Sequence, residues 1–338
     1  MSVVNIILVV LAFSLLIIVH ELGHFVLAKI NGVKVLEFSL GMGPKIWGFK
    51  IKETEYNLKA FPIGGYVNMY GQDAPVDDPD SFSSKSPWRR ITIVSAGVIM
   101  NFLLAIIIFV TVSMNFGFSE NKLGDIQDNM PAKEAGLQKG DEIVRANGHK
   151  VFTSMDISVE INNSVNKPVK LDYLRNGVEY SVDVTPKKKD NAYMIGIIFA
   201  NNTNPTFLDA TKHSFKESAT LITQTYRVLK NLFTGKADVT KEVGGPVTIV
   251  KMSNQAAQAG VWNLLYFTGY ISIQLAIMNL LPFPALDGGW LIILLIEAIT
   301  RKKVPDKVVQ GINSIGFIAL MALMVLVTIK DILYPIKF

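Results

Sequence analysis

Four runs of apolar residues, each about as long as a bilayer is thick, constrain this chain more than any other feature. A helix needs about 20 apolar residues to cross the hydrocarbon core, and the four runs cover 3–28, 91–116, 264–281 and 312–329. Charged residues make up 18% of the 338 residues, against about 25% in soluble domains. The chain is therefore expected to be a polytopic α-helical membrane protein with four transmembrane helices.

Lysine and arginine residues gather beside these runs, in the segments 29–90 and 301–307. Such clusters mark the cytoplasmic side of a membrane, so both termini and the long segment 117–262 are expected outside the cytoplasm. The net charge of +5 reflects these flanks, and no nucleic-acid partner is expected. The chain has no cysteine, which excludes disulfides, thiolate catalysis and thiolate metal ligands.

Sequence patterns divide the chain into four parts. The first carries two spans and a segment, 33–70, that is predicted to form an inner β-hairpin or sheet of short strands with glycine-rich turns. The second is expected to be a β-rich α+β domain, with a short helix at 154–164 and an Asn-Gly hairpin turn. The third is a linker with an amphipathic helix, lying on the membrane or packed on the β domain, and the fourth carries the last two spans. The boundaries are 1–116, 117–190, 191–262 and 263–338.

The motif HELGH places three polar side chains inside the first apolar run. His20 and His24 are four residues apart, which puts them on one face of a helix. Two imidazoles so placed can hold one Zn²⁺, with Glu21 beside the metal as general base. A structural pairing of polar groups and an ion pathway are the alternatives, because ionisable groups in a membrane need compensation.

A catalytic zinc takes a third protein ligand and keeps one position open. Asp287 is the best candidate, because it is the only acid between Glu242 and Glu297 and lies in a membrane-embedded stretch. Pro282 and Pro284 break the helix before it. The alternative is that Asp287 caps the helix that follows. His149 and His213 are interpreted as surface residues.

Several motifs taken together resemble the site-2 protease family of intramembrane zinc metalloproteases. They are HELGH, FPIGGYVNM (61–69), SAGVIMNF (95–102) and NLLPFPALDGG (279–289). The stretch EAGLQKGDEIVRANG resembles a PDZ domain, and its place between the second and third spans is similar to the bacterial RseP/RasP branch. The chain has room for one PDZ domain where relatives often have two, and Ala96-Gly97 replaces a Gly-Pro pair seen in many relatives.

The resemblance implies a zinc endopeptidase of the bacterial cell membrane, with its active site toward the cytoplasmic side. It implies His20, His24 and Asp287 as zinc ligands and Glu21 as catalytic base. Substrate binding would involve Asn279, Gly64, Gly65, Pro282 and Pro284. Where some relatives carry an asparagine before Asn279, Gln274 stands here, which leaves the role of that position open.

The resemblance also implies the partners, which are the lipid bilayer and single-span membrane proteins. Expected substrates include anti-sigma factors and remnant signal peptides, cut after a first protease has trimmed the outer domain. The PDZ domain would then exclude bulky outer domains, bind a specific peptide or act as a spacer. The competing functions are an inactive scaffold that binds transmembrane segments and a metal or proton transporter.

Overall fold

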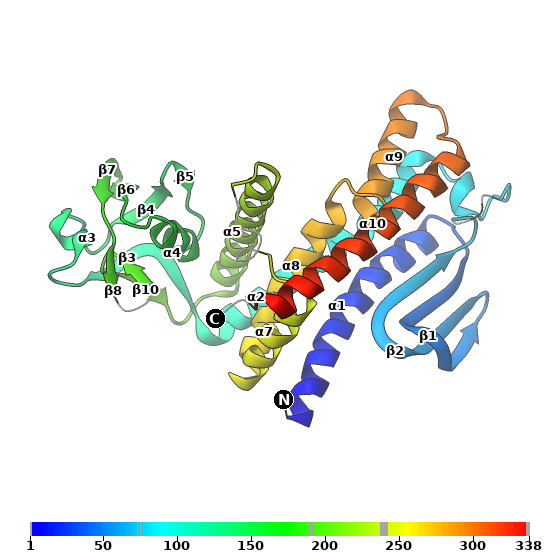
Figure 1. Ribbon diagram of the computed structural model, residues 1–338, viewed down its shortest axis with the longest axis horizontal. Coiled ribbons are helices and arrows are strands. Elements are labelled where there is room, and N and C mark those ends of the chain that lie inside the picture. The colour runs from blue at the N-terminus through cyan, green and yellow to red at the C-terminus, as the bar shows by residue number, and fades with distance from the viewer. Residues whose placement is uncertain (1, 73, 75, 190–191, 237–242, 336–338) are drawn as a thin grey trace. The chain divides into compact units, whose positions relative to one another are not determined.

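The computed structural model describes residues 2–72, 74, 76–189, 192–236 and 243–335 (Figure 1). Its contacts divide the chain into two compact units. Unit 1 combines Met1–Ala105 with Lys230–Phe338, and unit 2 is Ile106–Leu229. Segments from the two ends of the chain thus fold together.

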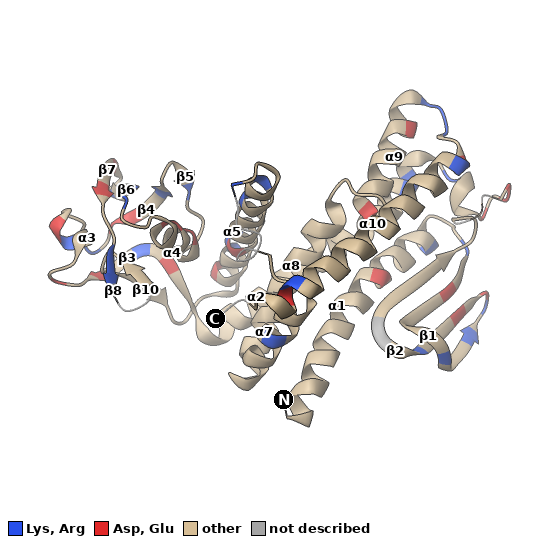
Figure 2. Cartoon of the chain, viewed as in Figure 1, with Lys and Arg blue, Asp and Glu red and all other residues tan. Residues whose placement is uncertain are grey.

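Long apolar helices dominate unit 1. Four helices of the described chain are long and apolar enough to cross a membrane: α1 (Val3–Ile30), α2 (Pro87–Phe116), α8 (Val261–Leu280) and α10 (Asp306–Leu333). In the most apolar stretch of α2 56% of the residues are buried, against 11% in α1 and 6% in α10. Two of the helices therefore expose broad apolar surfaces, as helices facing lipid do. In Figure 2, long stretches of these helices are free of charged residues, and several charged residues lie in the β-hairpin.

The described part of unit 1 also contains two shorter helices, α7 (Pro246–Gln258) and α9 (Asp287–Thr300). The buried carboxylate of Asp331 on α10 accepts a hydrogen bond from the backbone N–H of Thr248, 2.9 Å away, in the first turn of α7. Arg90 at the start of α2 forms a buried ion pair with Glu297 near the end of α9. These pairs fasten helices that are far apart in the sequence.

The segment between α1 and α2 forms one long hairpin rather than the expected short strands. Strand β1 (Val35–Ile51) pairs antiparallel with β2 (Thr54–Met69), and a short 3₁₀ helix, η1 (Phe82–Ser84), follows. The register of the pair shifts repeatedly along its length. Bulges produce such shifts and bend the strands. The glycines of this segment therefore do not end the strands, which continue as one hairpin. The base of the hairpin packs on α1, α2 and α9 through a cluster that includes Ala28, Val35, Val67 and Leu294.

Unit 2 contains a mixed array of strands and helices around a core that includes Leu123, Ile143, Ile157 and Leu171. Its main sheet has the strand order β10-β3-β4-β6-β7, with β5 paired to β4. The strands β6 and β7 meet at Asn176 and Gly177, both with positive φ, which confirms the predicted hairpin turn. The strands are β3 (Phe118–Ile126), β4 (Glu142–Ala146), β5 (His149–Lys150), β6 (Val169–Arg175), β7 (Val178–Val184), β8 (Lys187–Lys189), β9 (Ala192–Met194) and β10 (Ile197–Asn202). The shorter helices are α3 (Pro131–Glu134) and α4 (Ser154–Asn163), the second as predicted.

Helix α5 (Phe207–Phe233) packs on α4 through its polar face. Thr220 is fully buried and donates its hydroxyl to Asp156, 2.7 Å away, and Arg227 pairs with Glu160 at 2.6 Å. The apolar stripe is exposed instead, with Tyr226 65% and Phe233 86% accessible. Helix α5 therefore packs on the β domain, one of the two expected alternatives, but it does so through polar side chains and leaves its apolar stripe exposed.

Candidate metal centre

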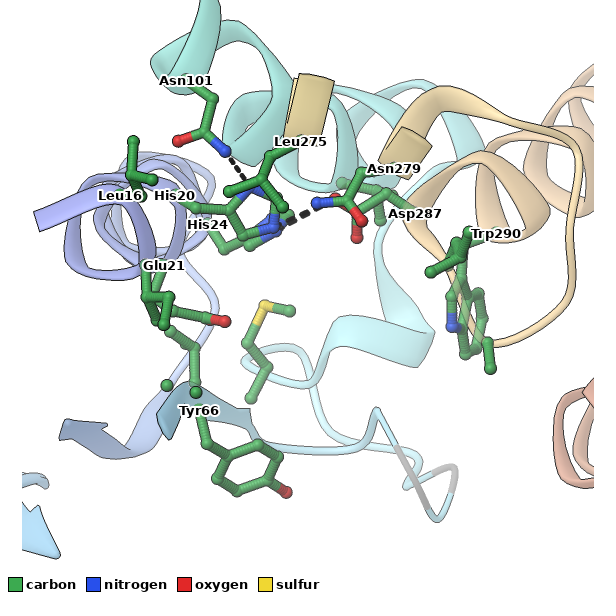
Figure 3. Close-up of a pocket in the computed structure, with 18 of the residues that line it drawn as sticks. Leu16, His20, Glu21, His24, Tyr66, Asn101, Leu275, Asn279, Asp287 and Trp290 are labelled. Carbon is green, nitrogen blue, oxygen red and sulfur yellow. Dashed lines mark hydrogen bonds and ion pairs between the residues drawn. The ribbon is translucent and has the colours of Figure 1, made fainter. Parts of the chain in front are cut away.

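The HELGH motif lies in the second half of α1, and its two imidazoles converge on one carboxylate from α9 (Figure 3). Nε2 of His20 and Nε2 of His24 are 3.2 Å apart. Oδ2 of Asp287 lies 3.3 Å from the first and 3.5 Å from the second. The structure thus brings together all three residues that the sequence nominated as metal ligands.

These distances match the edges of a tetrahedron around one metal ion. Zinc bonds of about 2.0–2.2 Å at tetrahedral angles place neighbouring ligand atoms about 3.3–3.6 Å apart. Oδ2 of Asp287 is also buried and makes no hydrogen bond with any described residue. A carboxylate oxygen and two imidazole nitrogens at this spacing can share one cation, so the donor set fits Zn²⁺.

Helix α2 orients both imidazoles through contacts with their Nδ1 atoms. Nδ1 of His24 lies 2.9 Å from the carbonyl oxygen of Ile93, an acceptor that fixes the proton on Nδ1 and leaves Nε2 free to bind metal. Nδ1 of His20 lies 3.3 Å from the side-chain amide of Asn101. The other end of that amide, Oδ1, is buried without a hydrogen-bond partner among the described residues. A half-turn of the amide makes Oδ1 the acceptor that a metal-binding His20 requires.

Gly97 lies between these two contacts, one helical turn from Ile93 and one from Asn101. A Cβ at this position would lie 2.6 Å from Cε1 and 2.8 Å from Nε2 of His20, and against Nε2 of His24. The histidines therefore fit only because this residue has no side chain. Asn101 and Gly97 are not among the site residues expected from the sequence, although their spacing of four and an asparagine in an uncharged apolar run were visible signals.

Asp287 is the first residue of α9 and does not cap it. Leu286 occupies the cap position, and no side chain there accepts a helix N–H. The preceding turn contains Ala285 with a φ of +71°. Gly288 and Gly289 lie so close to the backbone of residues 280–284 that a Cβ at either would collide with it. The turn thus aims the carboxylate of Asp287 at α1, and the capping alternative is wrong.

A cavity of about 430 Å³ adjoins the three ligand atoms. Other nominated residues that line it are Glu21, Gly64, Gly65 and Asn279 (Figure 3). Strand β2 touches α1 here, since a Cβ at Gly65 would lie 2.7 Å from Cγ of Glu21. Pro282 and Pro284 are not among its lining residues and lie in the turn before α9, where Pro284 contacts Gly316 of α10.

The other two histidines lie in unit 2. Nδ1 of His149 is 2.9 Å from Glu160, and half of its side chain is exposed. His213 is not the expected surface residue, because its side chain is 15% exposed and its ring stacks on Phe118 with a centroid distance of 4.0 Å. Burial, together with the charge of Lys216, lowers the pKa of His213 to about 4.

Comparisons with known proteins agree with this geometry. The model of peptidase family M50 matches residues 8–323. The chain is 47% identical to a presumed zinc metalloprotease of Clostridium perfringens, over 98% of this chain and 99% of that one. It is 32% identical to the zinc metalloprotease RasP of Bacillus licheniformis, over 96% of this chain and 97% of that one. A solved PDZ domain of an SdrC-like protein from Listeria monocytogenes covers 24% of this chain and 88% of that one, with 22% identity and a TM-score of 0.22, too slight a likeness to assign the fold of that segment.

Proposed function

This chain belongs to peptidase family M50 and is a zinc metalloprotease, and from that premise we propose that it cuts single-span membrane proteins within the bilayer. The observation that carries the proposal is the tetrahedral spacing of His20, His24 and Asp287, with both histidines inside a helix that is long and apolar enough to cross a membrane. The active site would lie toward the cytoplasmic side, since α1 runs inward from an outer N-terminus.

We assign zinc binding to Nε2 of His20, Nε2 of His24 and Oδ2 of Asp287. When bound there, zinc makes a water molecule more acidic and polarises the carbonyl of the scissile bond. The carboxylate of Glu21 accepts the proton of the attacking water and passes it to the leaving amine nitrogen. Asn279 lines the same cavity, where its amide is available to hydrogen-bond the substrate backbone.

Water must reach the site, and a second cavity supports a route from the cytoplasmic side. This cavity has a volume of about 260 Å³ and shares Gln72 and Trp290 with the cavity beside the metal ligands. It extends to Lys303, in the basic connection between α9 and α10, and to Asp306, the first residue of α10. Its polar lining, including Gln310 and Asn313, suits a hydrated passage.

The hairpin supports a way of holding the substrate. A transmembrane helix must unwind locally before its amides become available for cleavage. Gly65 brings the backbone of β2 to Glu21, and Gly64 lines the same cavity, so an unwound segment can pair with this strand as an added β-strand. The substrate class is transmembrane proteins such as anti-sigma factors and remnant signal peptides, in a second cut after ectodomain trimming. Unit 2, as an extracytoplasmic PDZ-type domain, would exclude substrates with bulky outer domains.

Replacement of Glu21 by Gln tests the assignment of the base. We expect Glu21→Gln to lower the cleavage rate of a model single-span substrate by about 10²–10⁴-fold, the usual contribution of a general base. Zinc content, measured by atomic emission, should stay near one per chain. Normal cleavage by Glu21→Gln would refute the role of Glu21, and an inactive wild-type enzyme with full zinc would favour the scaffold alternative.

Replacement of Asp287 by Ala tests the third ligand. Loss of one of three ligands should lower zinc content after dialysis against a chelator, while Asp80→Ala should leave it unchanged. Asp80 is a suitable control because it is an exposed carboxylate paired with Lys34 at 2.8 Å, away from the lining of the metal cavity. Undiminished zinc in Asp287→Ala would remove this residue from the ligand set.

A further inference from the structure

A basic recess lies where α2 begins and α9 ends. Its volume is about 430 Å³. The lining residues come from the first turn of α2, the last turns of α9 and the connection to α10. They are Pro87, Trp88, Arg90, Glu297, Ala298, Arg301, Lys302 and Lys303. None of them is among the three metal ligands or lines the metal cavity.

The charges of this recess do not cancel. Arg90 is neutralised by its buried partner Glu297, and Lys303 by Asp306 at 3.2 Å. Arg301 and Lys302 are exposed, and no carboxylate of a described residue lies within ion-pair distance of either. Two positive charges therefore remain for an anion from outside the protein. The start of the 30-residue helix α2 adds a partial positive charge to the same recess.

The recess also has an apolar side. Trp88 of α2, one of its lining residues, is 62% exposed. Exposed tryptophan beside lysine and arginine is typical of the level of lipid headgroups. A free inorganic anion would use the charges and leave this apolar surface unused.

We propose that the basic recess binds the phosphate-bearing headgroup of an anionic phospholipid. Arg301 and Lys302 contact the headgroup phosphate, and Trp88 lies against its glycerol region. Basic pockets between helices on the cytoplasmic side suit such headgroups. The site is separate from the proposed protease chemistry. The lipid would join the ends of two helices that both contribute to the metal centre, α2 through Asn101 and α9 through Asp287.

The test uses the full-length protein in detergent and counts bound phosphatidylglycerol by native mass spectrometry. The key variant is Arg301→Gln with Lys302→Gln, and we expect at least about tenfold weaker retention of phosphatidylglycerol, from the loss of two cations near the headgroup. The charge-preserving pair Arg301→Lys with Lys302→Arg should retain it. The matched control is Lys50→Gln with Lys52→Gln, which removes two exposed lysines near the tip of the β1–β2 hairpin and should leave retention unchanged.

Three outcomes would overturn the proposal. The first is equal retention of phosphatidylglycerol by the Gln pair and the wild type. The second is equal retention of zwitterionic phosphatidylcholine and phosphatidylglycerol by the wild type. The third is displacement of phosphatidylglycerol by inorganic phosphate alone at similar concentration, which would make the recess a phosphate site and not a lipid site. Because the readout is lipid mass, it holds equally in the Glu21→Gln variant, so failure here is distinguishable from failure of the protease assignment.

Discussion

At the scale of single residues, the polar groups of HELGH are balanced by partners from two other helices. Asp287 faces both Nε2 atoms, the carbonyl of Ile93 meets Nδ1 of His24, and Asn101 meets Nδ1 of His20. Each imidazole thus has one nitrogen directed at the metal position and one held from behind. This second contact sets the tautomer and the ring orientation, which decide whether a histidine can bind metal.

Asn101 gives the sharpest test at this scale. Because Asn101 orients His20, Asn101→Leu should weaken zinc affinity about 10–100-fold, as loss of such outer partners does. Asn101→Asp keeps an acceptor for the Nδ1 proton and should restore most of the affinity. Zinc affinity is measured by competition with a chromogenic chelator.

A matched control lies farther along the same helix. Ser113 is also buried on α2, and Ser113→Ala should leave zinc affinity unchanged. If Asn101→Leu and Asn101→Asp lose zinc to the same extent, Asn101 supports only the packing of the helix and does not position His20.

At the scale of elements, the approach of α1 and α2 depends on two glycines. A Cβ at Gly23 would lie 2.7 Å from the carbonyl carbon of Ala96, and one at Gly97 would meet both histidines. Small residues allow membrane helices to pack closely. A glycine also allows a close contact between β2 and α1, where Gly65 lies against Glu21. Side-chain volume at these contacts therefore controls the geometry of the metal centre.

Addition of one methyl group to α2 should separate the two helices. We expect Gly97→Ala to lower zinc content and cleavage together, because α1 must shift or its imidazoles must turn away. Gly311→Ala on α10 adds the same group where no atom lies within 4 Å, and it should be neutral or stabilise the helix by up to about 1 kcal/mol. Zinc content and thermal stability of both variants are compared in detergent. A zinc content of Gly97→Ala equal to that of the wild type would show that α1 and α2 can accommodate the added methyl group, and would contradict the prediction.

At the scale of the whole molecule, the centre is built from both ends of the chain, while the intervening residues form unit 2 with a core of its own. Unit 2 contains a histidine that makes its stability depend on pH. His213 is packed on Phe118 and remains neutral because burial lowers its pKa to about 4. The nearest carboxylate, Glu217, is 3.8 Å from Nε2 of His213, beyond hydrogen-bonding distance.

Unit 2 should lose stability as the pH falls from about 6.5 to about 4. The unfolded chain binds a proton at His213 near the ordinary pKa of about 6.5, whereas the folded unit binds it near 4, so acid favours unfolding in this window. Between pH 7 and pH 5 the loss is about 2 kcal/mol. Hydrogen exchange of the amides of β3, corrected for intrinsic rates, measures it. His213→Phe keeps an aromatic ring against Phe118 and should make the stability of unit 2 depend less on pH. If the stability of this variant falls as steeply with pH as that of the wild type, His213 is not the cause.

The sequence by itself determined the local features of this protein. Length and hydropathy defined the apolar segments, the spacing of four placed His20 and His24 on one face, and the joint motifs indicated the peptidase family that the comparisons then showed. The isolated acid after a proline break nominated Asp287. These inferences succeed because periodicity and residue type can be read from short stretches of the sequence.

Only the tertiary structure decided how distant parts meet. It joined α9 to α1 so that Oδ2 of Asp287 lies at tetrahedral spacing from both histidines, and it selected the carbonyl of Ile93 as a partner. It also merged the expected short strands into one hairpin, buried His213 and turned the polar face of α5 inward. Long-range packing decides these features. Every residue has a backbone carbonyl, so residue type does not reveal which one will accept a hydrogen bond. Which face of a helix is buried depends on the element that packs against it.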